Sequence, residues 1–140
     1  MAHEEVFARL REILIAYEGR LPVLADRPGN YELGMPPTPM GKPGTFVAAA
    51  RDGKAYASFH LMPVYAFPDL VDAASPQLRK RMQGKSCFNF SRVDEPLFTE
   101  LEGLTARGIE RFRELDVSRM SAARPGRSQR RPRSGALGLR

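Results

Sequence analysis

The stretch that decides the fold of this chain is TFVAAARDGKAYASFHLM, residues 45–62. Its two halves, residues 45–50 and 55–62, are apolar or alternate between apolar and polar side chains, which is typical of β-strands. Asp52 and Gly53 lie between them, and an Asp-Gly pair between two such runs is a strong signal for a tight turn. The stretch therefore predicts an antiparallel hairpin.

The second strand of this hairpin has two chemically different faces. Successive side chains in a strand point to opposite sides of the sheet. The apolar side is expected to face the core and carries Ala55, Ala57, Phe59 and Leu61. The other side is expected to face away from the core and carries Tyr56, Ser58, His60 and Met62.

A later strand, residues 86–91, repeats this alternation. Its core side would carry Phe88 and Phe90, and its other side Cys87, Asn89 and Ser91. If the two strands are neighbours, His60 and Cys87 share one polar patch.

Amphipathic helices are predicted at both ends of the domain. Residues 4–18 place one apolar stripe at helical spacing: Val6, Phe7, Leu10, Ile13, Leu14 and Tyr17. Gly19 would end this helix. Asp94 would cap a final helix over residues 95–115, whose stripe is Leu97, Leu101, Leu104, Gly108, Phe112 and Leu115. A glycine on that stripe indicates a close approach to the sheet.

The remaining segments predict only short helices and strands. Residues 20–43 are rich in Pro and Gly, and only residues 31–35 predict a strand there. Pro63 and Pro68 interrupt the pattern, and Ser75-Pro76 would begin a short helix that runs to Gln83. The predicted fold is α+β, a two-layer sandwich in which the N- and C-terminal helices cover one face of an antiparallel sheet of about four strands.

The net charge of +6 is unevenly distributed along the 140 residues. Residues 118–140 contain seven arginines and no acid, so residues 1–117 retain 15 basic against 16 acidic side chains, a net charge of −1. We therefore divide the chain into a domain at 1–117 and a disordered Arg-rich tail at 118–140. Nucleic-acid binding would act only through that tail.

The composition also indicates the cellular compartment of the protein and argues against several kinds of cofactor. The single cysteine allows no intrachain disulfide. No signal-peptide core and no run of 18 apolar residues is present, so we expect a cytoplasmic protein without a membrane partner. One Cys and two His at no recognised ligand spacing predict no metal, and no dinucleotide-binding loop is present. We expect no cofactor.

The polar strand face is the candidate site. A ligand or partner would contact Tyr56, Ser58, His60, Lys85, Cys87 and Asn89. His60 and Asn89 would hydrogen-bond, Lys85 would supply charge and Tyr56 would give a flat contact. A weaker anion-binding candidate is the basic run Arg79, Lys80 and Arg81.

Catalysis is an alternative reading of the same face. A thiol near an imidazole can be activated as a thiolate, which would make Cys87 a nucleophile beside His60. No third, orienting carboxylate is evident in the sequence. We therefore favour binding without catalysis.

Three segments, YELGMP (31–36), HLMP (60–63) and MQGKSCFNF (82–90), resemble the bacterial YdhG-like family of small domains of unknown function. The resemblance covers residues 4–115 and implies an α+β sandwich. Most members have no assigned reaction, and some are described as frataxin-like, which implies iron handling for iron–sulfur assembly as an alternative function.

A frataxin-type iron site requires a ridge of acidic residues on the first helix and the sheet edge, because hard iron ions prefer carboxylate ligands. The first helix instead mixes acidic and basic residues: Glu4, Glu5, Glu12 and Glu18 with Arg9, Arg11 and Arg20. We therefore carry over no metal ligand from the family.

Overall fold

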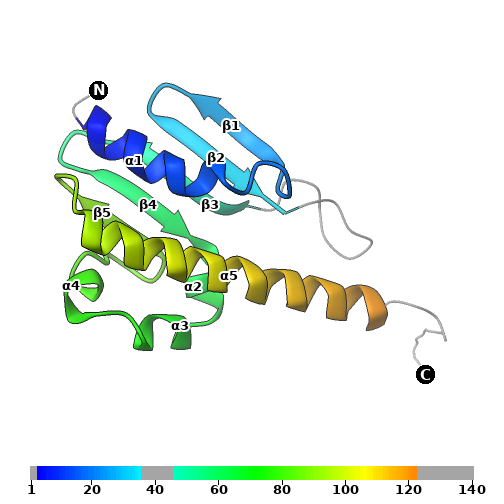
Figure 1. The fold of residues 1–140 in the computed structure, drawn as a ribbon. Helices are drawn as coiled ribbons and strands as arrows, with labels where there is room; N and C mark the ends of the chain where they lie inside the picture. The colour runs from blue at the N-terminus through cyan, green and yellow to red at the C-terminus, as the bar shows by residue number, and fades with distance from the viewer. Residues whose placement is uncertain (1–2, 36–45, 123–140) are drawn as a thin grey trace.

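The structure is a computed structural model that describes residues 3–35 and 46–122, with side chains up to residue 114 (Figure 1). Its elements, in chain order, are α1 (Glu4–Ile15), β1 (Val23–Arg27), β2 (Asn30–Gly34), β3 (Phe46–Asp52), β4 (Ala57–Leu61), α2 (Met62–Ala66), α3 (Asp69–Asp72), α4 (Pro76–Arg79), β5 (Cys87–Phe90) and α5 (Glu95–Ala122).

The strands form one antiparallel sheet in the order β1-β2-β3-β4-β5, so each strand pairs with its neighbours in the chain. The predicted hairpin is confirmed as β3 and β4, with Ala50 opposite Phe59. Its connection is longer than the predicted Asp52-Gly53 turn, because Asp52 still pairs with Ala57 and residues 53–56 join the strands, so that Ala55 is exposed and does not face the core. The α+β class is confirmed as well. The strand count differs, because five strands are present where about four were predicted.

The additional strand is β1, which lies at the edge of the sheet. Pro22 and Pro28 flank this strand and do not lie within it, so neither removes a hydrogen bond from its interior. Gly29 has a φ of 79° and completes a Pro-Gly turn into β2. The prolines that argued against a strand thus mark its two ends.

Helices α1 and α5 lie side by side on one face of the sheet (Figure 1), as the sequence predicts. The core forms between these helices and the sheet. The predicted stripe of α1 is buried from Val6 to Leu14, whereas Tyr17, beyond the end of the helix, is partly buried. The largest fully buried side chains are Tyr31, Phe59, Phe88, Phe90 and Phe98. No helix of the described residues covers the opposite face of the sheet.

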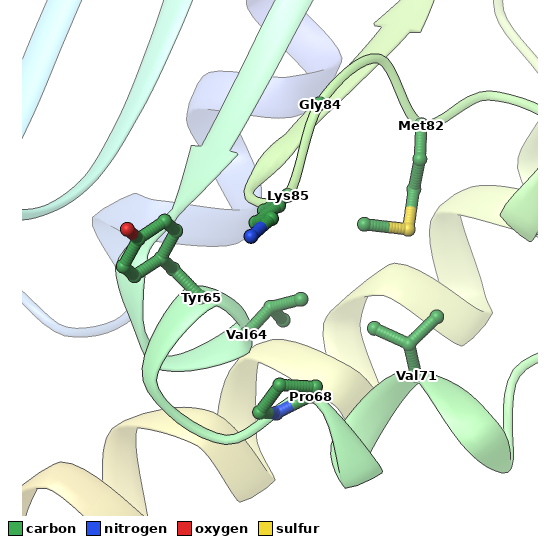
Figure 2. A pocket seen from close by; sticks show the side chains of 7 residues that line it. All are labelled: Val64, Tyr65, Pro68, Val71, Met82, Gly84 and Lys85. Carbon is green, nitrogen blue, oxygen red and sulfur yellow. The ribbon is translucent and has the colours of Figure 1, made fainter.

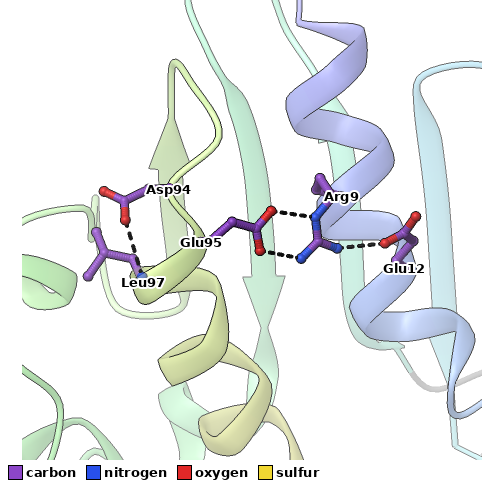
Figure 3. Close-up of polar contacts among 5 residues, drawn as sticks. All are labelled: Arg9, Glu12, Asp94, Glu95 and Leu97. Atoms are coloured by element: carbon purple, nitrogen blue, oxygen red, sulfur yellow. Dashed lines mark hydrogen bonds and ion pairs between the residues drawn. The ribbon is translucent and has the colours of Figure 1, made fainter.

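An ion-pair cluster joins the two long helices near the start of α5 (Figure 3). The guanidinium of Arg9 donates to both carboxylate oxygens of Glu95, at 2.8 and 2.6 Å, and to Glu12 at 2.6 Å. Asp94 Oδ1 accepts the backbone N–H of Leu97 at 3.2 Å, which confirms Asp94 as the cap of the final helix. The Arg9–Glu95 pair thus links the start of α5 to α1, and the Asp94 cap satisfies an N–H group in the first turn of α5.

Several predicted boundaries are wrong. Helix α1 ends at Ile15, and turns continue to Arg20. The segment predicted to be interrupted by Pro63 and Pro68 contains the short helices α2 and α3. Pro63 lies in the first turn of α2 and Pro68 at the cap of α3, positions where a missing N–H costs nothing.

The two later helices also differ from the prediction. Helix α4 ends at Arg79 and does not reach Gln83, and Met82 instead forms an isolated bridge with Phe88 of β5. Helix α5 continues to Ala122, five residues past the predicted domain end at 117. The rest of the predicted tail, 123–140, lies outside the described residues, as does the Pro-rich segment at 36–43.

Gly108 does mark a close approach, although the nearest neighbour lies in α2. A Cβ at this position would lie 2.9 Å from Pro63 Cβ and 3.8 Å from Leu61 Cδ2 of the sheet. Helix α5 therefore packs directly against the start of α2 at this point.

Candidate functional site

The pairing of β4 with β5 brings four of the predicted site residues together. His60 lies opposite Cys87 and Ser58 lies opposite Asn89. The alternating apolar residues, Phe59 and Phe88, are fully buried under the helices. All four polar residues are partly exposed on the other face of the sheet, so the adjacency that the sequence left open is present.

These side chains hydrogen-bond mainly to one another. His60 Nε2 lies 3.1 Å from Ser58 Oγ and 3.9 Å from Cys87 Sγ. The Cys87 thiol donates to Asn89 Oδ1 at 3.4 Å. Much of the hydrogen-bonding capacity of the patch is therefore already used within the protein.

Gln83, which the sequence analysis missed, connects this patch to the loop before β5. Its Oε1 accepts hydrogen bonds from Tyr56 Oη at 3.1 Å and from Asn89 Nδ2 at 2.6 Å. Its backbone N–H donates to Cys87 O at 2.8 Å. No periodicity in the sequence could have revealed this role, because Gln83 lies outside every predicted strand. The loop at residues 82–85 is thus held on the sheet by the polar patch.

A charged group missed by the sequence analysis flanks the patch on β2 and β3. Arg51 lies between Asn30 and Ser58 in the strand register. It donates to Glu32 Oε2 at 2.9 Å and to Asn30 Oδ1 at 3.1 Å. The hydrogen bond from Arg51 lowers the pKa of Glu32, so this carboxylate is ionised and committed to Arg51.

Electrostatics at the patch keep Cys87 and His60 neutral. Burial raises the pKa of the Cys87 thiol, and Arg51 opposes this only in part. Burial and Arg51 together lower the pKa of His60, against a smaller opposing effect of Glu32. A neutral thiol beside a neutral imidazole is the opposite of the thiolate–imidazolium pair that a cysteine nucleophile needs.

We expect Cys87 to react with iodoacetamide near neutral pH more slowly than N-acetylcysteine, because the thiolate is the reacting form and burial disfavours it. Its rate should continue to rise beyond the pH at which the rate for N-acetylcysteine levels off. Alkylation followed by mass spectrometry measures both rates, and Cys87→Ser is the blank. Labelling as fast as the model thiol would favour the catalytic alternative.

Lys85 lies apart from the other five candidates. It lines a pocket of about 450 Å³ between the α2–α3 segment and the loop at 82–85. Figure 2 shows Lys85 and Met82 extending from that loop toward side chains of α2 and α3. The full lining is Val64, Tyr65, Pro68, Val71, Met82, Gly84 and Lys85.

This pocket is mainly apolar and carries one charge. Val64 is almost completely buried, whereas Tyr65 is 54% exposed. Lys85 Nζ lies 5.9 Å from the centroid of that ring. Gly84 has a φ of 82°, which a glycine adopts readily and which turns the loop so that Met82 and Lys85 both line the pocket.

The basic run Arg79, Lys80 and Arg81 does not form one site. Arg79 donates to two backbone carbonyls before α4, those of Ala74 at 2.7 Å and Asp72 at 3.4 Å. It therefore closes the turn between α3 and α4. Lys80 and Arg81 line a different pocket, so Arg79 does not converge with them on a shared site.

The described residues contain no group of three His, Cys, Asp or Glu side chains that could hold a metal ion. Within residues 3–35 and 46–122, no helix has the length and apolar character needed to cross a membrane. Comparisons with protein-family models, with curated proteins and with solved structures found no match to this chain. The resemblance to the YdhG-like family remains a prediction.

Proposed function

We propose that the protein is a non-enzymatic, cytoplasmic binding domain. Its ligand would be a small apolar molecule with one anionic group, held in the pocket that contains Lys85. The observation that carries this proposal is the pocket itself, about 450 Å³ in volume, with an apolar floor and one ammonium group at its edge. Pockets of this size and character are typical of small-molecule sites.

The chemistry of the lining argues for the ligand class. Val64, Pro68 and Val71 offer apolar contacts but no hydrogen-bond donors from their side chains. Lys85 offers a positive charge on a flexible stem, which suits a single carboxylate at the mouth of the pocket. A ligand would thus bury its apolar part and keep its charge near solvent.

The polar strand face supports this site indirectly. Gln83 accepts hydrogen bonds from Tyr56 and Asn89, and it lies between Met82 and Lys85, which both line the pocket. We infer that the patch positions the loop and that its side chains do not themselves contact the ligand. The neutral state of Cys87 and His60 favours binding over catalysis for the same face.

Three probes test the ligand class with the full chain: octanoate, 1-octanol and acetate. Octanoate should bind best, 1-octanol less well because it lacks the charge, and acetate least because it lacks the apolar chain. Lys85→Met should weaken octanoate binding about fivefold and leave 1-octanol binding unchanged, since an exposed ion pair contributes up to about 1 kcal/mol. Titration followed by NMR chemical shifts measures all three.

Lys54→Met is the matched control, because Lys54 is an exposed lysine in the turn between β3 and β4. It should leave octanoate binding unchanged. Gln83→Ala should weaken octanoate and 1-octanol to the same extent, because it loosens the loop and leaves the charge in place. Octanoate binding that is insensitive to both Lys85→Met and Gln83→Ala would overturn the proposal, and so would the absence of binding.

A further inference from the structure

A second pocket, about 190 Å³ in volume, lies on another part of the surface. It forms where the residues after α4 meet the turn that joins β5 to α5. Its polar lining includes Lys80, Arg81, Ser91, Arg92 and Asp94. Phe90 and Leu97, both nearly buried, lie beneath these polar groups as an apolar floor.

The positive charges of this pocket have no partners within the described residues. The side chains of Lys80, Arg81 and Arg92 form no hydrogen bond or ion pair there, although neighbouring arginines such as Arg79 do. The one acid, Asp94, already caps α5 by accepting the N–H of Leu97 (Figure 3). Three cations and one carboxylate leave the lining with a net charge of +2.

Backbone and side-chain contacts hold the two sides of the pocket together. The N–H of Asn89 in β5 donates to the carbonyl of Arg81 at 2.8 Å, so Arg81 is fixed beside the strand that leads to Arg92. Ser75, at the start of α4, binds Glu100 of α5 through its hydroxyl at 2.7 Å and its N–H at 3.0 Å. The backbone of Arg81 is therefore anchored to β5, and the start of α4 is anchored to α5.

We propose that this pocket binds the phosphate group of a small phosphate monoester. Two guanidinium groups match the planar, two-point geometry that phosphate oxygens accept, and the ammonium and the Ser91 hydroxyl add further donors. Above its second pKa a phosphate monoester carries two negative charges, which equal the surplus charge of the lining. A carboxylate or a phosphodiester carries only one. The site is separate from the Lys85 pocket and does not depend on it.

The experiment is a titration of the full chain with methyl phosphate at constant ionic strength and pH 8, followed by NMR chemical shifts. Methyl phosphate should bind in a saturable way and about tenfold more tightly than dimethyl phosphate, the singly charged diester. Equal affinity for the two compounds would show that the site does not select a dianion and would overturn the proposal.

A paired substitution locates the binding. Arg81→Gln combined with Arg92→Gln should weaken methyl phosphate at least tenfold, because it removes both guanidinium groups and keeps side chains of similar length. Lys54→Gln is the control for net charge and should change the affinity less than twofold. Methyl phosphate affinity that is unchanged in the double variant, or reduced as much by Lys54→Gln, would place binding elsewhere or in diffuse charge. Circular dichroism verifies that each variant is folded.

Discussion

Phe88→Ala is expected to lower the free energy of unfolding by about 4 kcal/mol. Phe88 is fully buried, lies opposite Phe59 in the strand pairing and also bridges to Met82. Removing its ring leaves a cavity that neither neighbour fills without moving the strand. Because domains of this size are stable by only about 5–15 kcal/mol, the variant should be close to the limit of folding.

Urea denaturation followed by circular dichroism measures this loss. Val23→Ala is the control, since Val23 lies on the edge strand β1 and is 43% exposed. It should cost less than about 1 kcal/mol. Equal effects of the two substitutions would contradict the placement of Phe88 at the centre of the core.

Alanine at the two glycines of α5 is expected to have opposite effects. Gly103→Ala should stabilise the protein by up to about 1 kcal/mol, because alanine is the better helix former and the nearest atom, Arg107 Nη1 at 3.4 Å, can move. Gly108→Ala should destabilise it by about 1–2 kcal/mol, because its methyl group would lie 2.9 Å from Pro63 Cβ. The ring of Pro63 is rigid and cannot turn away.

The same urea experiment compares the two variants, which differ from wild type by one methyl group each. Helix propensity is common to both and cancels, so the difference of about 2–3 kcal/mol reports the contact between α5 and α2. Stabilisation by both alanines would mean that this close approach is not enforced in solution.

The sequence predicts the parts of the fold that depend on periodic patterns. The hairpin of β3 and β4, the stripe of α1 and the Asp94 cap follow from local chemistry and are present. The missed elements are short and are bounded by prolines. Those prolines lie at the ends of β1 and in the first turn of α2, where they remove no hydrogen bond from the element. Composition alone does not show whether a proline lies at the end or in the interior of an element.

The candidate site also has one part that the sequence predicts and another that it does not. Alternation predicts which side chains of β4 and β5 share a face, but it cannot show that Lys85, two residues before Cys87, lines a different pocket. The loop geometry around β5 determines which hydrogen bonds Gln83 accepts and places Arg92 in the lining of a pocket. Such positions have no periodic signature, so only the three-dimensional arrangement identifies them.

The chain-order pairing of the sheet has a consequence for folding kinetics. Since every strand pairs with the next one along the chain, the β1–β2 and β3–β4 pairings close only short loops, which keeps their entropic cost small, whereas β5 reaches β4 across residues 62–86, which contain α2, α3 and α4. The slower steps are then expected to be the pairing of β5 with β4, the docking of α1 on β3 and β4, and that of α5 on the α2–α4 segment, which join residues distant in sequence. The Arg9–Glu95 ion pair joins α1 to α5, so it can form only when both helices are in place.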